Sequence, residues 1–368
     1  MRLGGTARTT RAAAIWIAAA LVAAVVGAGV YGGHADADSV SAEAATSTTA
    51  STARLAPTTS STATSAPSTT TSAPPAIVAP VTEPPPPETQ PDPVPVAAEP
   101  ASGGWSADPY AGLGTWIDVY DWTAAYGGAQ IALADIDQMA ADGVQTLFVQ
   151  PVRWDVDTDL MELDRLLPLL RRAHADGMRV VAWYLPDLAD VDKDLRHLDA
   201  IASQLPIDGL AIDIESRAVD DIEQRNARLL ALSDHLRAAH PGDVLGAIVL
   251  PPVVLDGINP AYWPSYPWAG LANDYDVWLP MSYFTFRREG WRDANAYTAA
   301  NVAGVRSHLG QPDAIVHPIG GIGDLTTVED VRGMVAACQA QSCFGASIYD
   351  YRTTQDPAVR TSLQAFRR

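Results

Sequence analysis

Two acidic side chains with a spacing of two residues are the strongest sign of chemistry in this sequence. Residues 207–215 read IDGLAIDIE, a pattern typical of a buried strand. Side chains alternate faces along a strand, so Asp213 and Glu215 share one face with Ala211, and Glu215 lies nearest the carboxyl end. Two carboxyls this close titrate as a coupled pair, and partial burial beside a like charge raises the proton affinity of one of them. A carboxyl protonated near neutral pH suits a general acid; a structural acid pair bound to Arg217 or another loop arginine is the alternative.

Further carboxylates follow other apolar runs of the chain. They are Asp118 and Asp121 after the first run, Asp155 after the second, Asp187 after the third and Asp350 after the last. Any of them could be the second carboxylate of a two-acid glycosidase, acting as nucleophile or base according to its distance from Glu215. Each one, taken alone, is better explained as an acidic loop residue than as a catalyst.

Aromatic residues crowd the same ends of the apolar runs. Sugar rings have apolar faces that pack on aromatic side chains, whereas acids and amides bind their hydroxyl groups. We therefore predict that a glycan contacts Tyr120, Trp122, Trp154, Trp183, Tyr283, Tyr349, Asp118, Asp187 and Asp350. Core packing is the alternative for each aromatic residue, and it is the better interpretation for Trp278, which should point toward helices.

Short apolar runs alternate with amphipathic segments eight times. The predicted strands are 115–120, 144–150, 180–185, 209–214, 245–250, 277–281, 314–318 and 345–349, and the helical patterns include 131–141, 160–175, 195–204, 222–240, 295–309 and 328–339. Such alternation predicts parallel strands, and eight units in this length fit an α/β fold of the (β/α)8 TIM-barrel type. The active site would then lie at the carboxyl ends of the strands. The long connection 253–275, which carries Tyr262, Trp263, Tyr266 and Trp268, is expected to be functional.

Three segments of the predicted barrel resemble glycoside hydrolase family 18, the chitinase-like barrels. Residues 208–215, DGLAIDIE, resemble the family's Asp-x-x-Asp-x-Asp-x-Glu signature; residues 276–284, DVWLPMSYF, resemble its sixth-strand Met-x-Tyr-Asp motif; and residues 345–349, GASIY, resemble its eighth strand, where an aromatic residue floors the sugar site. The resemblance implies that Glu215 is the acid/base. It also implies that Asp213 orients the substrate's acetamido group and that Tyr283 helps to hold that group.

The sequence also departs from that family. Ala211 replaces the middle Asp of the signature, Phe284 replaces the sixth-strand Asp, and residues 182–187, AWYLPD, replace the Ser-x-Gly-Gly motif of the third strand. The first change removes the group that would share a proton with Asp213, and the second removes a contact to the acetamido group or its neighbour. Two functions therefore remain: an extracellular glycoside hydrolase acting on a polysaccharide, or a non-catalytic glycan-binding or wall-associated barrel.

The first hundred residues differ from the rest. Arg2, Arg8 and Arg11 precede an apolar run over 12–33, and 35–37 could form a cleavage site, so residues 1–37 are predicted to be a signal peptide or membrane anchor. Residues 38–104 are rich in Ala, Ser, Thr and Pro and are predicted to be a disordered linker. The barrel, residues 105–368, would then be secreted, or tethered to the membrane or cell wall.

The remaining expectations concern partners and redox state. The formal net charge of −19 argues against a nucleic-acid partner. No histidine pair has metal-ligand spacing, and no glycine-rich dinucleotide motif follows the first strand, so we expect no metal and no cofactor. We expect a monomer. Cys338 and Cys343 are the only cysteines, and in an exported protein such a pair is predicted to form a disulfide.

Overall fold

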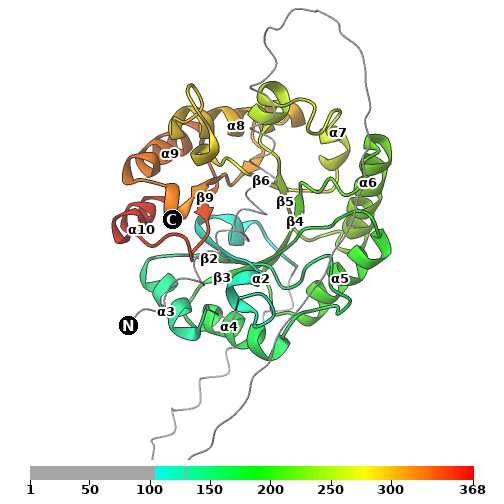
Figure 1. Cartoon of the computed structure of the whole chain (residues 1–368), viewed down its shortest axis with the longest axis horizontal. Helices are drawn as coiled ribbons and strands as arrows, with labels where there is room; N and C mark the ends of the chain where they lie inside the picture. The colour runs from blue at the N-terminus through cyan, green and yellow to red at the C-terminus, as the bar shows by residue number, and fades with distance from the viewer. Residues whose placement is uncertain (1–103, 128–129) are drawn as a thin grey trace, which may run out of the picture. The chain divides into compact units, whose positions relative to one another are not determined.

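A computed structural model describes residues 104–127 and 130–368. In this part of the chain a parallel sheet curls into an α/β barrel, and helices surround it (Figure 1). The predicted leader, 1–37, and nearly all of the predicted linker, 38–104, lie outside the described residues. Within the described ranges, no helix is both long and apolar enough to cross a bilayer.

Nine strands form the sheet, and every pairing in it is parallel. Their order is β7-β6-β5-β4-β3-β2-β1-β9-β8. The strands are β1 (Gly112–Ile117), β2 (Thr146–Val149), β3 (Arg179–Tyr184), β4 (Gly209–Ile214), β5 (Leu245–Val249), β6 (Val277–Pro280), β7 (Ile315–Val316), β8 (Ile319–Ile322) and β9 (Gly345–Tyr349).

The predicted seventh strand, 314–318, is divided into β7 and β8. β7 pairs with β6 and β8 pairs with β9, while a parallel bridge between Met281 and Ile319 connects the two ends of the sheet. Pro318 lies at the division. Because proline has no backbone N–H to donate, the strand ladder is interrupted there, although the Pro318 carbonyl still accepts from the Ser347 amide at 3.2 Å.

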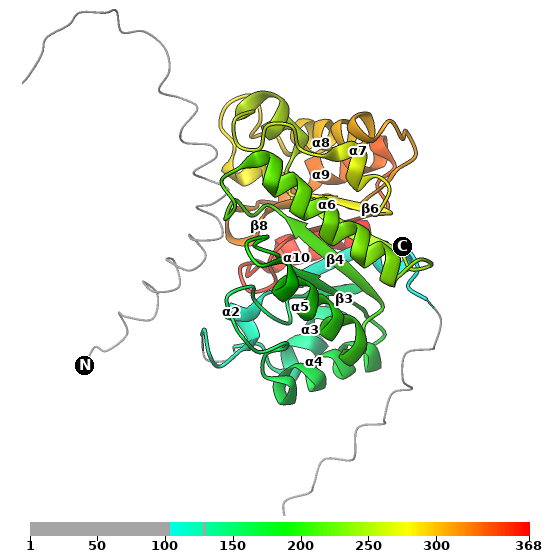
Figure 2. The same cartoon turned by 90° about the vertical axis from the view of Figure 1, so that its right-hand side faces the viewer.

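Helices follow the strands and cover the outside of the sheet; in Figure 2, α5 and α6 lie beside β3 and β4. The helices are α2 (Val119–Trp122), α3 (Leu133–Ala141), α4 (Leu163–Ala175), α5 (Val191–Gln204), α6 (Ile222–Ala239), α7 (Trp268–Leu271), α8 (Ala294–Leu309), α9 (Val328–Gln341) and α10 (Pro357–Leu363). Short helical turns are η1 (Asp108–Tyr110), η2 (Val254–Ile258), η3 (Phe284–Phe286), η4 (Gly323–Leu325) and η5 (Gln364–Phe366).

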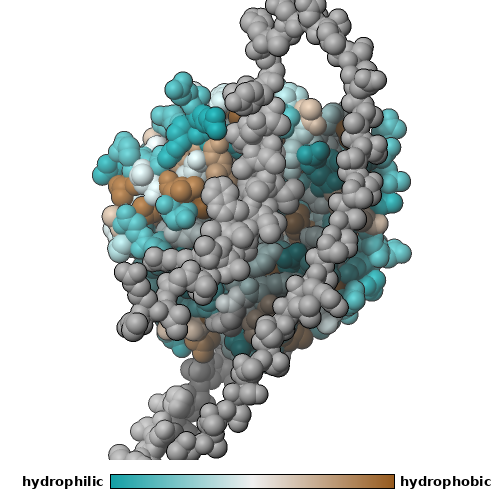
Figure 3. All heavy atoms as spheres, viewed as in Figure 1, coloured by the Kyte–Doolittle hydropathy of each residue, from teal (hydrophilic) through white to brown (hydrophobic). Residues whose placement is uncertain are grey.

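Besides Asp118 at the start of α2, aspartates begin four of the described helices. Their side chains accept hydrogen bonds from backbone amides in the first helical turn, and a negative charge there also complements the helix dipole. The residues are Asp190 for α5, Asp221 for α6, Asp293 for α8 and Asp356 for α10. Part of the acidic composition is therefore structural. The surface in Figure 3 is mainly hydrophilic with scattered apolar patches.

Aromatic side chains fill the inner, amino-terminal part of the barrel. Trp116 stacks on Phe148 with ring centroids 4.3 Å apart, and the Tyr110 hydroxyl donates to the Leu210 carbonyl at 2.8 Å. Glycine at position 114 leaves the space that the Phe148 ring occupies, because a Cβ there would come within 2.5 Å of it. The barrel interior is thus a packed core on which the upper rim rests.

His317 is fully buried and joins Tyr110 to Ser347 within this core by hydrogen bonds. Its Nδ1 lies 2.8 Å from the Tyr110 carbonyl, so Nδ1 carries the proton, and Nε2 accepts from the Ser347 hydroxyl at 3.0 Å. Trp116 in turn donates its indole N–H to the Ser347 oxygen at 2.8 Å. Burial lowers the His317 pKa to about 4, so the ring is neutral in this network.

The predicted disulfide is wrong for this structure, because Cys338 and Cys343 are free thiols. α9 continues beyond Cys338 to Gln341, and Ser342 then turns the chain in the left-handed conformation. That turn places the Cys343 amide on the Cys338 carbonyl at 3.0 Å, and the two thiols contact each other by a hydrogen bond without being joined.

Packing against Gly345 gives a direct test of the barrel interior. A Cβ at this position would come within 2.3 Å of the Tyr110 carbonyl oxygen and 2.4 Å of His317 Nδ1. Because the first obstacle is backbone, Gly345→Ala should lower the free energy of unfolding by about 1 to 3 kcal/mol, the usual effect of overpacking. Gly242→Ala is the control, since no atom lies within 4 Å of its Cβ position. Urea denaturation measures both, and equal stability of the two variants would contradict the packing described.

Candidate functional site

Asp213 and Glu215 lie together at the carboxyl end of β4. Asp213 belongs to the strand, which is buried along its whole length, and Glu215 is the first residue after Ile214. At the start of the same motif, Asp208 is a structural residue: it accepts from the Val180 amide at 2.8 Å and contacts His174 at 2.9 Å. Asp208 thus joins β4 to its neighbour β3, whereas the other two acids are directed into the barrel.

Neither acid of the pair has a hydrogen-bond partner among the described residues. Asp213 is 7% exposed and Glu215 is partly buried, and Asp213 Oδ1 and Glu215 Oε2 make no hydrogen bond to any described residue. Burial, and then the charge of Glu215, raise the pKa of Asp213 well above its usual value. Burial raises the Glu215 pKa to about 7. Both acids therefore hold their protons to a higher pH than exposed carboxyl groups do, and Glu215 exchanges its proton near neutral pH.

Tyr283, one of the predicted contact residues, lies within electrostatic range of both acids. It lies just beyond β6 and is 8% exposed. Burial raises the Tyr283 pKa most, and the charges of Glu215, Asp213 and Asp350 raise it further. Its ring centroid is 6.2 Å from that of Tyr349. The ends of β4, β6 and β9 thus converge on one site.

Tyr349 connects the site to the first strand. Its hydroxyl donates to Asp118 Oδ2 at 2.7 Å, and Asp118 Oδ1 accepts from the Tyr120 amide at 2.8 Å. Asp350 is 3% exposed and accepts from the Thr353 amide at 2.7 Å. These aspartates shape the rim through hydrogen bonds to backbone and to Tyr349.

Trp183 faces the same interior from β3. Its ring meets Trp116 edge-on at 6.0 Å, it is 6% exposed, and its indole N–H is buried without a partner among the described residues. A buried donor without a partner is unusual, because such groups are normally hydrogen-bonded. Trp183 pairs in register with Ala211, so this free donor lies on the strand next to the one that carries the acids.

The other predicted contact residues lie farther out or deeper in. Arg153 lies 5.3 Å from the centroid of the Tyr120 ring and 5.9 Å from that of Trp154. The Asp187 side chain accepts from the Ala189 amide at 2.8 Å within its own loop. Trp122 differs from the expected role: it is 0% exposed and donates to the Gln150 carbonyl at 2.9 Å, so it supports the rim from the core.

The two departures from the family motif have simple packing explanations. Ala211 is fully buried, and its Cβ is 3.0 Å from the position a Cβ would take at residue 246, beside Tyr110, so apolar packing fills the space below Asp213. Phe284 is also fully buried, in a separate cluster with Tyr297 and Met334. Phe284 therefore packs away from the barrel interior and does not cover the acids.

The long connection after β5 supplies two tyrosines that the sequence analysis did not assign to the site. Tyr262 donates to the Glu215 carbonyl and Tyr266 donates to the Ile214 carbonyl, each at 3.4 Å. Burial raises the pKa of both, and the charges of Glu215 and Asp213 contribute to it. The signal that could have identified them was the length and aromatic content of the connection.

Three carboxylates form the one group among the described residues with the geometry to hold a metal ion. Oxygens of Asp118, Asp121 and Asp350 lie within 4.8 Å of one another. These oxygens already have partners: Asp121 accepts from the Asp118 amide, and the other two bind as described above. The arrangement stabilises the turn after β1.

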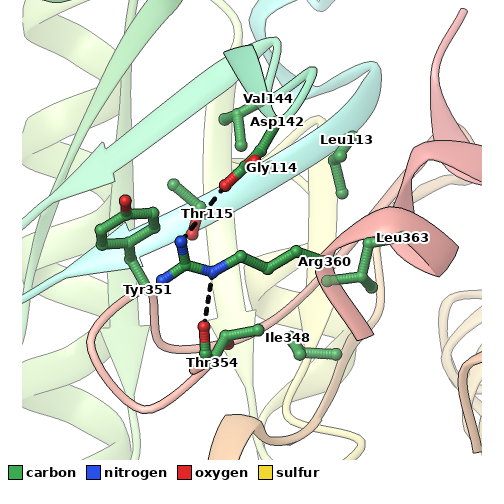
Figure 4. Close-up of a pocket in the computed structure, with 10 residues that line it drawn as sticks. All are labelled: Leu113, Gly114, Thr115, Asp142, Val144, Ile348, Tyr351, Thr354, Arg360 and Leu363. Carbon is green, nitrogen blue, oxygen red and sulfur yellow. Dashed lines mark hydrogen bonds and ion pairs between the residues drawn. The ribbon is translucent and has the colours of Figure 1, made fainter. Parts of the chain in front are cut away.

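A small pocket lies on the helix side of the sheet, away from the acids. It is lined by residues of β1, β9 and α10, and Arg360 lies inside it, donating to the Thr354 carbonyl at 2.6 Å and to Asp142 at 3.4 Å (Figure 4). None of the residues of the candidate site lines this pocket, so it does not extend that site.

No protein-family model and no curated protein matches this sequence. Solved structures match its fold with a TM-score of 0.50. The spore cortex-lytic enzyme SleL of Bacillus megaterium QM B1551 is 9% identical, over 70% of this chain and 74% of that one. A chitinase-like agglutinin of Robinia pseudoacacia and a GH18 chitinase of Cycas revoluta in complex with (GlcNAc)3 are each 12% identical, over 69% of this chain and 99% of theirs. The chain thus shares the barrel fold of these proteins at very low sequence identity.

The raised pKa of Glu215 predicts a pH-dependent stability. Its carboxyl takes up a proton at about pH 7 in the folded state but near 4.5 when unfolded, so its burial destabilises the protein increasingly as pH rises through that window. Glu215→Gln should therefore raise the melting temperature at pH 8 and change it little at pH 4.

Asp208→Asn is the matched control. Burial acts to raise the Asp208 pKa, but hydrogen bonds and charge from His174, together with the Val180 amide, hold it below its usual value. Its stabilisation is present above the unfolded pKa and is lost as pH falls, so this variant should melt lower at pH 8. A Glu215→Gln variant that melts lower than the wild type at pH 8 would contradict the burial of an unpaired acid.

Proposed function

We propose that this protein is a glycoside hydrolase that cleaves a polysaccharide, with Glu215 as the general acid/base. The observation that carries the proposal is the pair Asp213 and Glu215 at the carboxyl end of a barrel strand, where both acids lack hydrogen-bond partners and burial raises the pKa of each, that of Glu215 to about 7. Buried acids without partners cost stability, and such groups are concentrated at catalytic sites.

The chemistry requires one proton transfer in each direction. Glu215 gives its proton to the glycosidic oxygen as the bond from that oxygen to the sugar C1 breaks, and its carboxylate then accepts a proton from the water that attacks C1. Asp213 adjoins it and orients the substituent next to C1. Tyr283 and Tyr349 supply aromatic surface, and the free Trp183 N–H supplies a donor, to the sugar bound between them.

A non-catalytic glycan-binding barrel is the second candidate. Two observations favour it: Ala211 stands where the family signature has an acid, and one protein of similar fold is an agglutinin. Against it, Phe284 packs outside the barrel interior. The unpaired acids are also present although they lower the stability of the protein. A binding-only barrel would have no use for a protonated Glu215.

The site of action belongs to the same proposal. A leader over residues 1–37 and a Ser/Thr/Pro-rich linker over 38–104 would place the barrel outside the cell, either released or tethered by the leader. The substrate would then be an extracellular or cell-wall glycan, bound by a monomer.

Replacing the general acid should separate catalysis from binding. Glu215→Gln keeps the shape of the side chain but removes the transferable proton, so turnover should fall by about 10² to 10⁴. Glycan binding should persist, since the aromatic neighbours are unchanged. A reducing-sugar assay over chitin, peptidoglycan and plant glucans measures turnover, and Arg332→Gln on the outer face of α9 is the control. Full turnover in Glu215→Gln would end the assignment.

The pH profile should identify the acid directly. Because Glu215 must be protonated to act, kcat should fall as pH rises through about 7. Asp213→Asn removes the neighbouring charge and should lower kcat, more steeply on N-acetylated substrates if the substrate's own acetamido group takes part. Rates measured between pH 4 and 9 give the profile; a kcat that rises through pH 7 would contradict the role of Glu215 as acid.

A further inference from the structure

Two arginines follow β4, Arg217 in the connection to α6 and Arg225 near the start of α6 itself. Arg217 follows Glu215 by two residues and is exposed, with its guanidinium carbon 4.8 Å from the centroid of the Tyr262 ring. Arg225, in the first turns of α6, is 2% exposed and lies 4.7 Å from the centroid of Trp263. Consecutive aromatic residues of the long β5–β6 connection therefore hold both cations in place.

The positive charges of these two arginines are not neutralised by ion pairs within the described part of the protein. The ion pairs among the described residues include neither Arg217 nor Arg225. Arg225 Nε donates to the Val219 carbonyl at 2.7 Å, but its Nη1 is buried and makes no hydrogen bond to a described residue. Burial, and then the charge of Arg217, lower the Arg225 pKa, with Asp220 as the opposing charge nearby. A buried donor and a like-charged neighbour are costly unless an anion joins them.

Tyr262 shows how close the arginines are to the acids. Its hydroxyl donates to the Glu215 carbonyl, and its ring lies under Arg217. After burial, the charges acting on this phenol are Glu215 and Asp213, which raise its pKa, and Arg217 and Arg225, which lower it. Tyr262 thus contacts both the backbone of Glu215 and the guanidinium of Arg217, which places the two residues side by side beyond the carboxyl end of β4.

We propose that Arg217, supported by Arg225, binds a carboxylate carried by the glycan, so that the substrate class is an acidic polysaccharide. This inference rests on the proposed function and specifies its substrate. A guanidinium presents two parallel donors that match a carboxylate, and its stacking on Tyr262 fixes their direction. The carboxylate belongs to a uronic acid or to a carboxyalkyl ether on the sugar, because both present the same planar anion. In a protein of net charge −19, an anionic chain needs such a local cation to approach.

Binding to matched polymers tests this without hydrolysis. The full chain carrying Glu215→Gln is run in affinity electrophoresis against carboxymethyl chitin and hydroxyethyl chitin, and against the same two derivatives of cellulose. These pairs share a backbone and differ in the charge of the substituent. The carboxymethyl polymer should bind more tightly, and adding Arg217→Gln should weaken that binding by roughly tenfold, the loss of a charged hydrogen bond. Binding to the hydroxyethyl polymer should weaken much less.

Two further variants separate a specific contact from net charge. Arg217→Lys keeps the charge without the two parallel donors, so it should restore part of the carboxymethyl binding. Arg332→Gln removes the same charge from the exposed face of α9, where Arg332 pairs with Glu329, and should change neither affinity. Equal binding of both polymers, unchanged carboxymethyl binding in Arg217→Gln, or no binding of either polymer would overturn the inference. Failure of the proposed function is seen separately, as absence of hydrolysis by the wild type.

Discussion

Burial of two unpaired carboxyl groups at the end of β4 is the constraint on which the rest of the site depends. Asp213 is buried and Glu215 is partly buried above a filled barrel interior, in which Trp116 stacks on Phe148 and Tyr110 closes the inner end. Ala211 is part of this apolar filling, at the position where the signature of family 18 has its middle acid. Desolvation, more than repulsion between the acids, then raises the Glu215 pKa.

The packed interior also determines which neighbours the acids have. Tyr283, Tyr262 and Tyr266 surround the pair from β6 and the β5–β6 connection, while Tyr349 is held by Asp118 from the opposite side. Tyrosines can bury their rings and still donate a hydrogen bond, so they exclude water without leaving the backbone carbonyls of β4 unpaired. Beyond these tyrosines, Arg217 adds a positive charge near the acid pair.

The sequence predicted the barrel well because alternation of strands and helices is a local property. The two-residue period of β4 was the basis for predicting that Asp213 and Glu215 face the barrel interior. Trp278 was predicted to point toward the helices, and it packs against Trp268 of α7. The division of the seventh strand was missed, because the missing donor of Pro318 matters only once its partner strands are known. Trp122 was expected at the rim, but a loop position does not reveal that its indole N–H reaches the Gln150 carbonyl.

The account is tested most directly by titrating the Glu215 carboxyl itself. Carbon-13 NMR of protein labelled at the glutamate side-chain carboxyl, compared with the Glu215→Gln variant, identifies its resonance and follows it with pH. The structure predicts a midpoint near 7, far above the usual 4.5. A midpoint near 4.5 would show that Glu215 is ionised like a surface carboxylate, and it would remove the basis for its role as general acid.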